Sequence, residues 1–227
     1  MAINLNKHME FVDPNKLKEN KLNVNIIGVG AVGSYIALQA VKLGIPELTI
    51  WDFDTVDDHN ITNQVYTFND VNKLKVDALE EHLMASNPEL ILHKKGKWNP
   101  GDPVDGVVFL EVDSMKVRQA FVEDNEYNDL LKLVIDARIG LETGEVHCCK
   151  WNDDNSRENY INKVNSFNDD DANITVSACG TTLSVSPSVY LSAATAVATL
   201  INFINKKDLV NYVAFNAFDF LMKGRNL

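Results

Sequence analysis

A glycine turn followed by two carboxylates is the part of this sequence best suited to chemistry. Three glycines, Gly28, Gly30 and Gly33, stand in the spacing G-x-G-x-x-G directly after a short apolar run. Asp52 and Asp54 follow a second apolar run, roughly 20 residues further along the chain. Such a turn lets a phosphate approach the backbone at the start of a helix, and a carboxylate at the later position can bind ribose hydroxyls. The pattern predicts a nucleotide- or dinucleotide-binding site.

Later polar residues extend this predicted site toward transfer of a nucleotide to a carboxylate. Lys73 and Lys75 are two amines that precede a predicted helix, and Asp113 follows the apolar run 106–112. An amine can offset the charge that develops on an α-phosphate and on departing pyrophosphate. A carboxylate can hold Mg²⁺, which bridges phosphate oxygens and orients an in-line attack. Together these groups supply what nucleotidyl transfer needs.

Each of these residues also has an ordinary structural interpretation. The two lysines can be solvated residues at a helix start, Asp113 can be the N-cap of the next helix, and Asp54 can be a turn residue. A nicotinamide-dependent dehydrogenase also accounts for the glycine turn and Asp52. That alternative lacks a clearly placed catalytic histidine, because His147 lies inside a predicted strand. The joint occurrence of all the groups in this order favours nucleotidyl transfer.

Alternating strands and helices must position these side chains. Apolar runs predict strands at 24–27, 48–51, 89–93, 106–112 and 131–137. Helical spacing predicts helices over 31–43, 71–86, 115–121 and 187–204. The segment 145–151 alternates like an antiparallel strand, 152–171 is a polar crossover, and 210–220 predicts a closing strand. The expected fold class is α/β: a Rossmann-like, mostly parallel sheet flanked by helices, with a C-terminal antiparallel extension.

Length and composition set further limits. The 227 residues fit a single domain, with an N-terminal arm (1–23), a nucleotide-binding core (24–137) and a C-terminal part (138–227). A net charge of −11 disfavours a nucleic-acid surface. Three cysteines without a C-x-x-C pair predict a reducing, cytoplasmic location and no zinc site, and no export signal is recognised. The uncharged stretch 187–204 just reaches spanning length, but its polar residues favour a buried helix over a membrane span.

The sequence resembles the adenylyltransferase family that includes the ThiF, MoeB and HesA proteins and the catalytic half of ubiquitin-activating enzymes. The matching segments are GVGAVGS, WDFDTVDDHNITNQ, K-x-KVDAL ending in SNPEL, and VDSMKVR, and weaker similarity continues to Phe203. The form DARIG around Arg138 is similar to short stand-alone members, some of them encoded by phages and mobile elements.

The resemblance implies an activity and its partners. It implies an enzyme that uses ATP and Mg²⁺ to adenylate the C-terminal carboxylate of a small ubiquitin-like or sulfur-carrier protein, with release of pyrophosphate. It also implies a homodimer, with the apolar helices and the N-terminal arm at the contact. No nucleic acid and no membrane is expected as a partner.

The resemblance further implies roles for single residues. The three glycines receive the ATP phosphates, and Asp52, with Asp54 beside it, receives the ribose hydroxyls. Asn60 and Gln64 line the phosphate site, Lys75 is the catalytic lysine, and Asp113 is the magnesium ligand. Cys179 lies where some members carry a reactive cysteine, although a lone cysteine beside a glycine is also an inert small residue.

The sequence departs from the family pattern in its arginines. Many members have Arg-Gln where this chain has Asn63-Gln64, and the first arginine of this chain is Arg118. One phosphate-binding cation and any arginine of the N-terminal arm are therefore missing. These losses leave open a second hypothesis, a nucleotide-binding scaffold or regulator without turnover. An NAD-dependent oxidoreductase, motivated by the segment from Gly28 to Asp52 alone, is the third.

Overall fold

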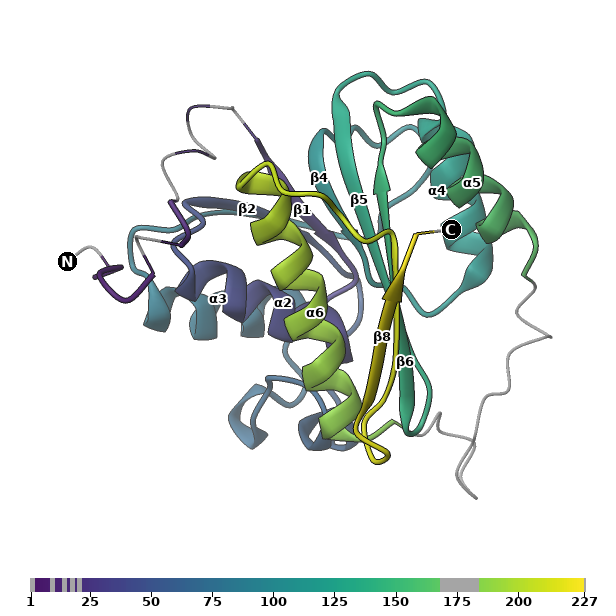
Figure 1. Cartoon of the computed structure of the whole chain (residues 1–227). Coiled ribbons are helices and arrows are strands. Elements are labelled where there is room, and N and C mark those ends of the chain that lie inside the picture. The colour runs from purple at the N-terminus through teal and green to yellow at the C-terminus, as the bar shows by residue number, and fades with distance from the viewer. Residues whose placement is uncertain are drawn as a thin grey trace.

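One sheet of eight strands organises the protein, in the order β3-β2-β1-β4-β5-β6-β7-β8 (Figure 1). The computed structural model describes residues 3–8, 11–13, 16, 19, 22–167 and 184–226. The strands are β1 (Val24–Ile27), β2 (Glu47–Trp51), β3 (Ile91–Lys95), β4 (Gly106–Leu110), β5 (Leu131–Ile139), β6 (Thr143–Lys150), β7 (Tyr212–Asn216) and β8 (Leu221–Arg225). Strands β1 to β5 pair in parallel, and β6, β7 and β8 are added antiparallel. The predicted fold class is confirmed.

Helices cover both faces of the sheet (Figure 1). One face carries α2 (Ala31–Lys42), α3 (Lys75–Ser86) and α6 (Ser186–Ile204), and the other carries α4 (Met115–Asn125) and α5 (Asp154–Asn165). Each face has its own cluster of buried apolar side chains. Every residue of β1 and β4 is buried, as expected for central parallel strands covered on both sides. The ends of these strands are therefore held rigidly.

Helix α6 is the uncharged stretch that reaches membrane-spanning length. Its length and composition alone would allow it to cross a membrane, but half of its apolar window is buried inside the protein. It packs against α2, β5 and β6. These contacts are those of a core helix. The polar residues in its sequence had favoured this prediction over a membrane span.

Two predictions for the C-terminal half need correction. The polar segment after β6 contains helix α5, which begins where Asp153 accepts a hydrogen bond from Ser156 N–H at 2.7 Å. Only Tyr160 and Val164 of this helix are buried, so its apolar periodicity is too sparse to recognise. The predicted strand 210–220 is present as the shorter β7, but it does not close the sheet, because it forms a hairpin with the edge strand β8. Among the earlier elements, β3 begins two residues later than predicted, and α3 begins at Lys75 rather than near Val71.

Candidate nucleotide-binding site

The glycine turn lies between β1 and α2, and packing requires two of its glycines. Gly28 has φ +91°, and a Cβ there would lie 2.5 Å from the carbonyl oxygen of Glu111. A Cβ on Gly33 would lie 2.0 Å from the carbonyl oxygen of Gly28. A Cβ on Gly30 would meet no atom within 4 Å. The backbone at Gly30 is therefore open to a ligand at the N-terminus of α2, where free N–H groups and the helix dipole favour an anion.

Asp52 connects this turn to the end of β2. Its Oδ2 accepts a hydrogen bond from Val29 N–H, and its Oδ1 accepts one from Asp54 N–H, both at 2.9 Å. The buried hydroxyl of Tyr66 donates to the carbonyl oxygen of Val29 at 2.7 Å and holds the turn from the other side. An ionised carboxylate offers about four lone-pair positions. Two are used here, so Asp52 keeps capacity for further donors such as ribose hydroxyls.

Lys75 is the first residue of α3, and it pairs with Asp54. Its Nζ lies 3.0 Å from Oδ2 of Asp54, and its backbone N–H donates to the Asp54 carbonyl oxygen at 2.9 Å. The Lys75 side chain is buried, whereas half of the Asp54 side chain is exposed. Asp54 is thus more than a turn residue, because its carboxylate pairs with Lys75 while its backbone N–H donates to Asp52.

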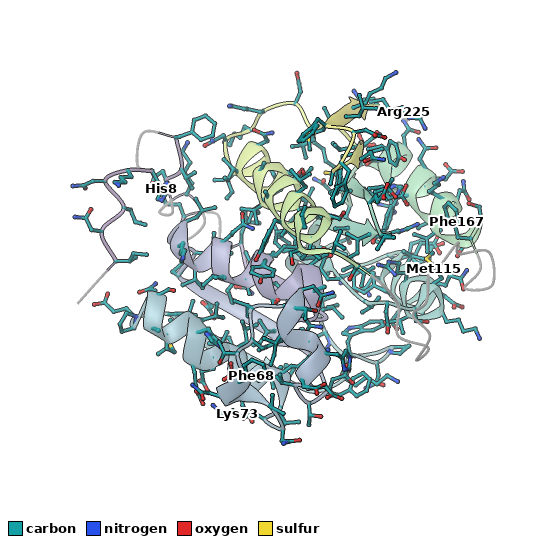
Figure 2. All side chains as sticks on the ribbon, turned by 90° about the horizontal axis from the view of Figure 1, so that it is seen from below. His8, Phe68, Lys73, Met115, Phe167 and Arg225 are labelled. Carbon is teal, nitrogen blue, oxygen red and sulfur yellow. The ribbon has the colours of Figure 1, made fainter. Side chains whose placement is uncertain are left out.

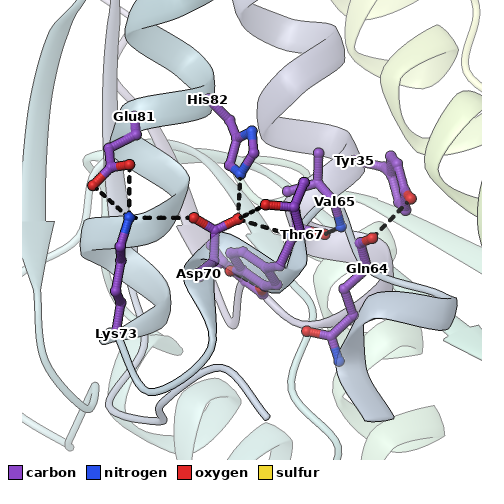
Figure 3. A network of polar contacts seen from close by, with 11 residues as sticks. Tyr35, Gln64, Val65, Thr67, Asp70, Lys73, Glu81 and His82 are labelled. Carbon is purple, nitrogen blue, oxygen red and sulfur yellow. Dashed lines mark hydrogen bonds and ion pairs between the residues drawn. The ribbon is translucent and has the colours of Figure 1, made fainter. Parts of the chain in front are cut away.

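The second lysine points elsewhere. Nζ of Lys73 lies 2.8 Å from Glu81 and 3.4 Å from the buried carboxylate of Asp70 (Figure 3). Figure 2 shows Lys73 far from Met115, which lies at the start of α4. Two lysines only two residues apart are therefore separated by the turn that precedes α3. Of the two amines, the structure joins only Lys75 to the candidate site.

Asp70 anchors the loop between β2 and α3. It accepts hydrogen bonds from Thr67 N–H and Oγ1, both at 2.8 Å, and lies 2.8 Å from Nε2 of His82 (Figure 3). Burial raises the pKa of the Asp70 carboxyl, but its bonds with His82 and Thr67 outweigh burial and lower the pKa to about 2. The loop that carries Asn60 and Gln64 is thus fixed by an ionised carboxylate.

Asn60 and Gln64 lie in this loop, packed against the start of α2. Asn60 is buried, and its Oδ1 accepts from Asp57 N–H at 3.0 Å, which makes it a structural cap of the short helix η1 (Asp58–Thr62). Gln64 accepts the Tyr35 hydroxyl on its backbone oxygen at 2.9 Å. Its side-chain Oε1 is buried without a partner in the described part of the chain. Of the two, the side chain of Gln64 is the better placed to meet a ligand.

Asp113 lies in the loop between β4 and α4, at the carboxyl edge of the sheet. Ser114 accepts the hydrogen bond from Lys116 N–H at 3.2 Å, so Ser114 is the N-cap of α4 and the capping interpretation of Asp113 is wrong. Asp113 is exposed and has no hydrogen bond or ion pair with another described residue. Glu111 N–H donates to Ile27 at 2.8 Å, which fixes this loop beside the glycine turn. Such a carboxylate can serve as an oxygen ligand for a hard cation.

Two arginines are engaged by one buried acid. Asp136, on β5, lies 2.9 Å from Nε of Arg118 and 2.6 Å from Nη2 of Arg138, and it accepts the Tyr160 hydroxyl at 2.9 Å. Burial raises the pKa of Asp136, but the two guanidinium groups hold it well below its usual range. Neither arginine therefore restores an unpaired cation to the site. Asn63, at the position of the missing arginine, donates to Ser184 Oγ at 2.6 Å.

The structure describes two of the three cysteines. Cys148 and Cys149 are buried in β6, and burial raises the pKa of each thiol to about 12. Neither is a thiolate near neutral pH, so neither is a nucleophile. Cys179 lies outside the described residues.

Three functional groups escaped the sequence analysis. Tyr66 supports the glycine turn and Asp136 pairs both arginines, yet neither stands in a recognisable spacing. Glu111 has two buried carboxylate oxygens that face the backbone of Ala137 and lie near Asp136 and Arg118. Burial raises its pKa well above the ordinary value for a glutamate. An acid inside the apolar run GVVFLEV was the available signal for Glu111.

Comparison with known proteins places the chain in a family. The model of the ThiF family matches residues 5–226. A ubiquitin-like modifier-activating enzyme 5 from Arabidopsis thaliana is 33% identical over 86 residues, which are 38% of this chain and 20% of that protein. A tRNA threonylcarbamoyladenosine dehydratase from Haemophilus influenzae is 34% identical over 68 residues, which are 30% of this chain and 26% of that protein. The matches thus span only about a fifth to a quarter of these relatives.

Solved structures share the fold. PaaA superposes with a TM-score of 0.69 at 19% identity and covers all of this chain and 75% of that one. E. coli MccB with MccA gives a TM-score of 0.70 at 18% identity, covering 94% of this chain and 66% of that one. E. coli MccB with ATP gives 0.67 at 20% identity. The family model, which matches residues 5–226, confirms the family resemblance: the chain belongs to the ThiF family.

Proposed function

We propose that the protein is an ATP-dependent adenylyltransferase that activates the C-terminal carboxylate of a small protein or peptide. The observation that carries this proposal is the direct joining of an open glycine turn, Asp52, Asp54 and Lys75 by hydrogen bonds and an ion pair. The names of similar proteins support the substrate class, since one relative is a ubiquitin-like modifier-activating enzyme and one similar structure holds MccB with MccA. ATP in another MccB structure supports the nucleotide.

The proposed reaction forms one bond and breaks one. An oxygen of the acceptor carboxylate attacks the α-phosphorus of ATP, and the bond between that phosphorus and the departing pyrophosphate breaks. The backbone at Gly30 and the first turn of α2 receive the phosphates, and Asp52 receives the ribose hydroxyls. Lys75 exchanges Asp54 for a phosphate oxygen and offsets developing charge. Mg²⁺ held by the exposed carboxylate of Asp113 would neutralise phosphate charge and orient the leaving group.

A second candidate function is an ATP-binding scaffold or regulator of the same fold that has lost turnover. The observation that favours it is the engagement of the cationic groups: Arg118 and Arg138 both pair with Asp136, and Asn63 is bonded to Ser184. Lys75 is then the only basic side chain that the described contacts connect to the glycine turn. Both candidates bind ATP, so turnover separates them.

Thermal unfolding with ATP–Mg²⁺, ADP and NAD in parallel tests the nucleotide site. A ligand at 100 times its dissociation constant adds about 2.7 kcal/mol to the stability of the native state. We expect ATP–Mg²⁺ to raise the melting temperature and NAD to leave it unchanged. Asp52→Ala should abolish the rise, whereas Asp129→Ala, an exposed acid that precedes β5, should retain it. Stabilisation by NAD alone would refute both candidates.

The family resemblance extends the proposal in two ways. We infer a homodimer whose contact uses α6 and the N-terminal arm, which gel filtration with light scattering tests directly. We also infer a cytoplasmic location, in keeping with two buried, unpaired thiols at Cys148 and Cys149. A monomer at all concentrations would remove the first inference without affecting the nucleotide site.

A further inference from the structure

The start of α6 is bonded to three consecutive residues of the loop between β2 and α3. Ser186 Oγ donates to the carbonyl oxygen of Thr62 at 2.8 Å, and Asn63 Nδ2 donates to Ser184 Oγ at 2.6 Å. The third connection runs through two tyrosines to the backbone of Gln64. One short stretch of this loop is therefore held along its length by a segment that lies far later in the chain.

The two tyrosines form a directed chain of hydrogen bonds from α6 to the loop. The hydroxyl of Tyr35 donates to the carbonyl oxygen of Gln64 at 2.9 Å (Figure 3), and it lies 3.2 Å from the hydroxyl of Tyr190. A phenol has a single O–H proton, so Tyr190 is the donor in the second contact. Burial and the hydrogen bond with Tyr190 raise the pKa of Tyr35, which therefore keeps this proton at neutral pH. The two rings also pack edge to face, with their centroids 4.7 Å apart.

Gln64 lies against the N-terminal turn of α2, where the phosphates are expected. The next residue, Val65, donates its N–H to Ser34 Oγ at 3.3 Å, which places this part of the loop on the helix. Figure 3 shows the side chain of Gln64 extending away from Tyr35. Its Oε1 is buried and makes no hydrogen bond to another residue of the described chain. A half-turn of this amide places an NH₂ donor at the same point, which suits a phosphate oxygen.

The start of α6 is itself anchored to the sheet. Ser188 Oγ donates to the carbonyl oxygen of Leu141, between β5 and β6, at 3.0 Å, and the side chains of Ser188 and Val189 are buried. Asn63 supplies no positive charge where many family members carry an arginine, but its amide joins the loop to this anchored helix. The helix is therefore a rigid support for the loop that carries Gln64.

We propose that the start of α6, through Ser184 and Tyr190, positions Gln64 for the phosphates of ATP and so sets the preference of the site for a triphosphate over a monophosphate. The inference rests on the proposed function, which assigns ATP to the glycine turn. Ser184 and Tyr190 are positioning residues, because they act through the loop. A loop that is already held in its bound conformation loses less conformational entropy when the ligand binds, and the ligand binds more tightly.

The ribose end of the site does not depend on this support. The carboxylate of Asp52 accepts the N–H groups of Val29 and Asp54, and neither residue hydrogen-bonds to α6 within the described chain. Loss of the contacts with α6 should therefore weaken the binding of the phosphates and leave the binding of the nucleoside unchanged. This selective loss distinguishes positioning of Gln64 from a general loss of stability.

Titration calorimetry on the full chain tests the proposal, with ATP–Mg²⁺ as one ligand and AMP, measured by competition, as the other. Ser184→Ala and Tyr35→Phe each remove one hydroxyl from the path between α6 and the loop. We expect each variant to bind ATP–Mg²⁺ roughly 3- to 10-fold more weakly, the range for the loss of one neutral hydrogen bond, and to bind AMP as the wild type does. Ser166→Ala is the matched control, because Ser166 is exposed at the end of α5 and bonds only to Lys163.

A double variant separates the Asn63–Ser184 bond from other effects of the two substitutions. Asn63→Ala and Ser184→Ala remove the same bond, so the double variant should bind ATP–Mg²⁺ no more weakly than the weaker single variant. Unchanged ATP affinity in Ser184→Ala and Tyr35→Phe, equal weakening for ATP and AMP, or additive losses in the double variant would overturn the positioning role. A wild-type chain that does not bind ATP–Mg²⁺ would instead overturn the proposed function, and this inference with it.

Discussion

The two halves of the sheet use charged side chains in opposite ways. At the ends of β1, β2 and β4, Asp52 keeps unused lone pairs, Asp54 is half exposed, and Asp113 has no protein partner among the described residues. On β5, Asp136 is fully buried and satisfied by Arg118, Arg138 and Tyr160. The first group has capacity for a ligand, whereas the second is a closed structural network. Substitutions in the two halves should therefore damage different properties.

Asp136→Ala should have the largest effect, on stability. It removes the shared partner of two arginines: the almost entirely buried Arg118 loses its ion pair with Asp136, whereas Arg138 keeps Glu145 at 3.7 Å. Breaking a buried pair in this way costs about 3–5 kcal/mol. Urea unfolding measures the loss, with Asp129→Ala as the exposed control. A loss below about 1 kcal/mol would mean that water replaces the carboxylate and that the network is not structural.

Lys75→Ala should lower turnover rather than stability. Removal of one preorganised charge that stabilises a transition state lowers the rate by roughly 10²–10³-fold. The Lys75–Asp54 pair has one half-exposed partner, so its loss should cost less than about 1 kcal/mol of stability. Lys73→Ala is the matched control, because Lys73 pairs with Glu81 and Asp70 away from the glycine turn. Equal rates for the two variants would contradict the separation of the two lysines.

Tyr66→Phe tests one contact of the half of the sheet that carries the glycine turn. It deletes only the hydroxyl that donates to the carbonyl oxygen of Val29. We expect a loss of about 1 kcal/mol of stability and weaker ATP binding, because Val29 in the glycine turn loses one of its two hydrogen bonds to side chains. Denaturant unfolding with and without ATP–Mg²⁺ separates these effects. An unchanged ATP affinity would show that Asp52 alone positions the turn.

The Asp70–His82 contact should give the smallest and most pH-specific effect. The folded pKa of Asp70, about 2, lies below its unfolded value, so its stabilising contribution is present above about pH 4 and lost as the pH falls toward 2. Asp70→Asn should therefore reduce stability at neutral pH and flatten the acid limb of the stability curve. Melting temperatures between pH 2 and 6 measure the slope. If the melting temperature of Asp70→Asn fell with pH as steeply as that of the wild type, other carboxylates would be responsible for acid unfolding.

The difference between the halves also explains how much the sequence alone could predict. Gly28, Gly33 and Asp52 were predictable because close packing and a short crossover fix both residue type and spacing. The opposite orientations of Lys73 and Lys75 depend on the turn before α3, which carries no such signal.

The elements of the C-terminal half have weaker signals in the sequence. The β7–β8 hairpin was missed because its turn, Ala217 to Phe220, contains neither glycine nor proline. Helix α5 was missed because the crossover buries so few of its side chains. Asp136 pairs with Arg118 and Arg138 across two elements, and only the folded chain brings these residues together.

The most direct test of the account is transfer of label from α-labelled ATP. The full chain is incubated with ATP–Mg²⁺ and the small-protein fraction of its source cells, and label on protein is followed together with released pyrophosphate. The account predicts label on the C-terminal carboxylate of a small protein, removable by hydroxylamine, strongly reduced by Lys75→Ala and unchanged by Lys73→Ala. Absence of label with the wild-type chain, or equal labelling by Lys75→Ala, would contradict it.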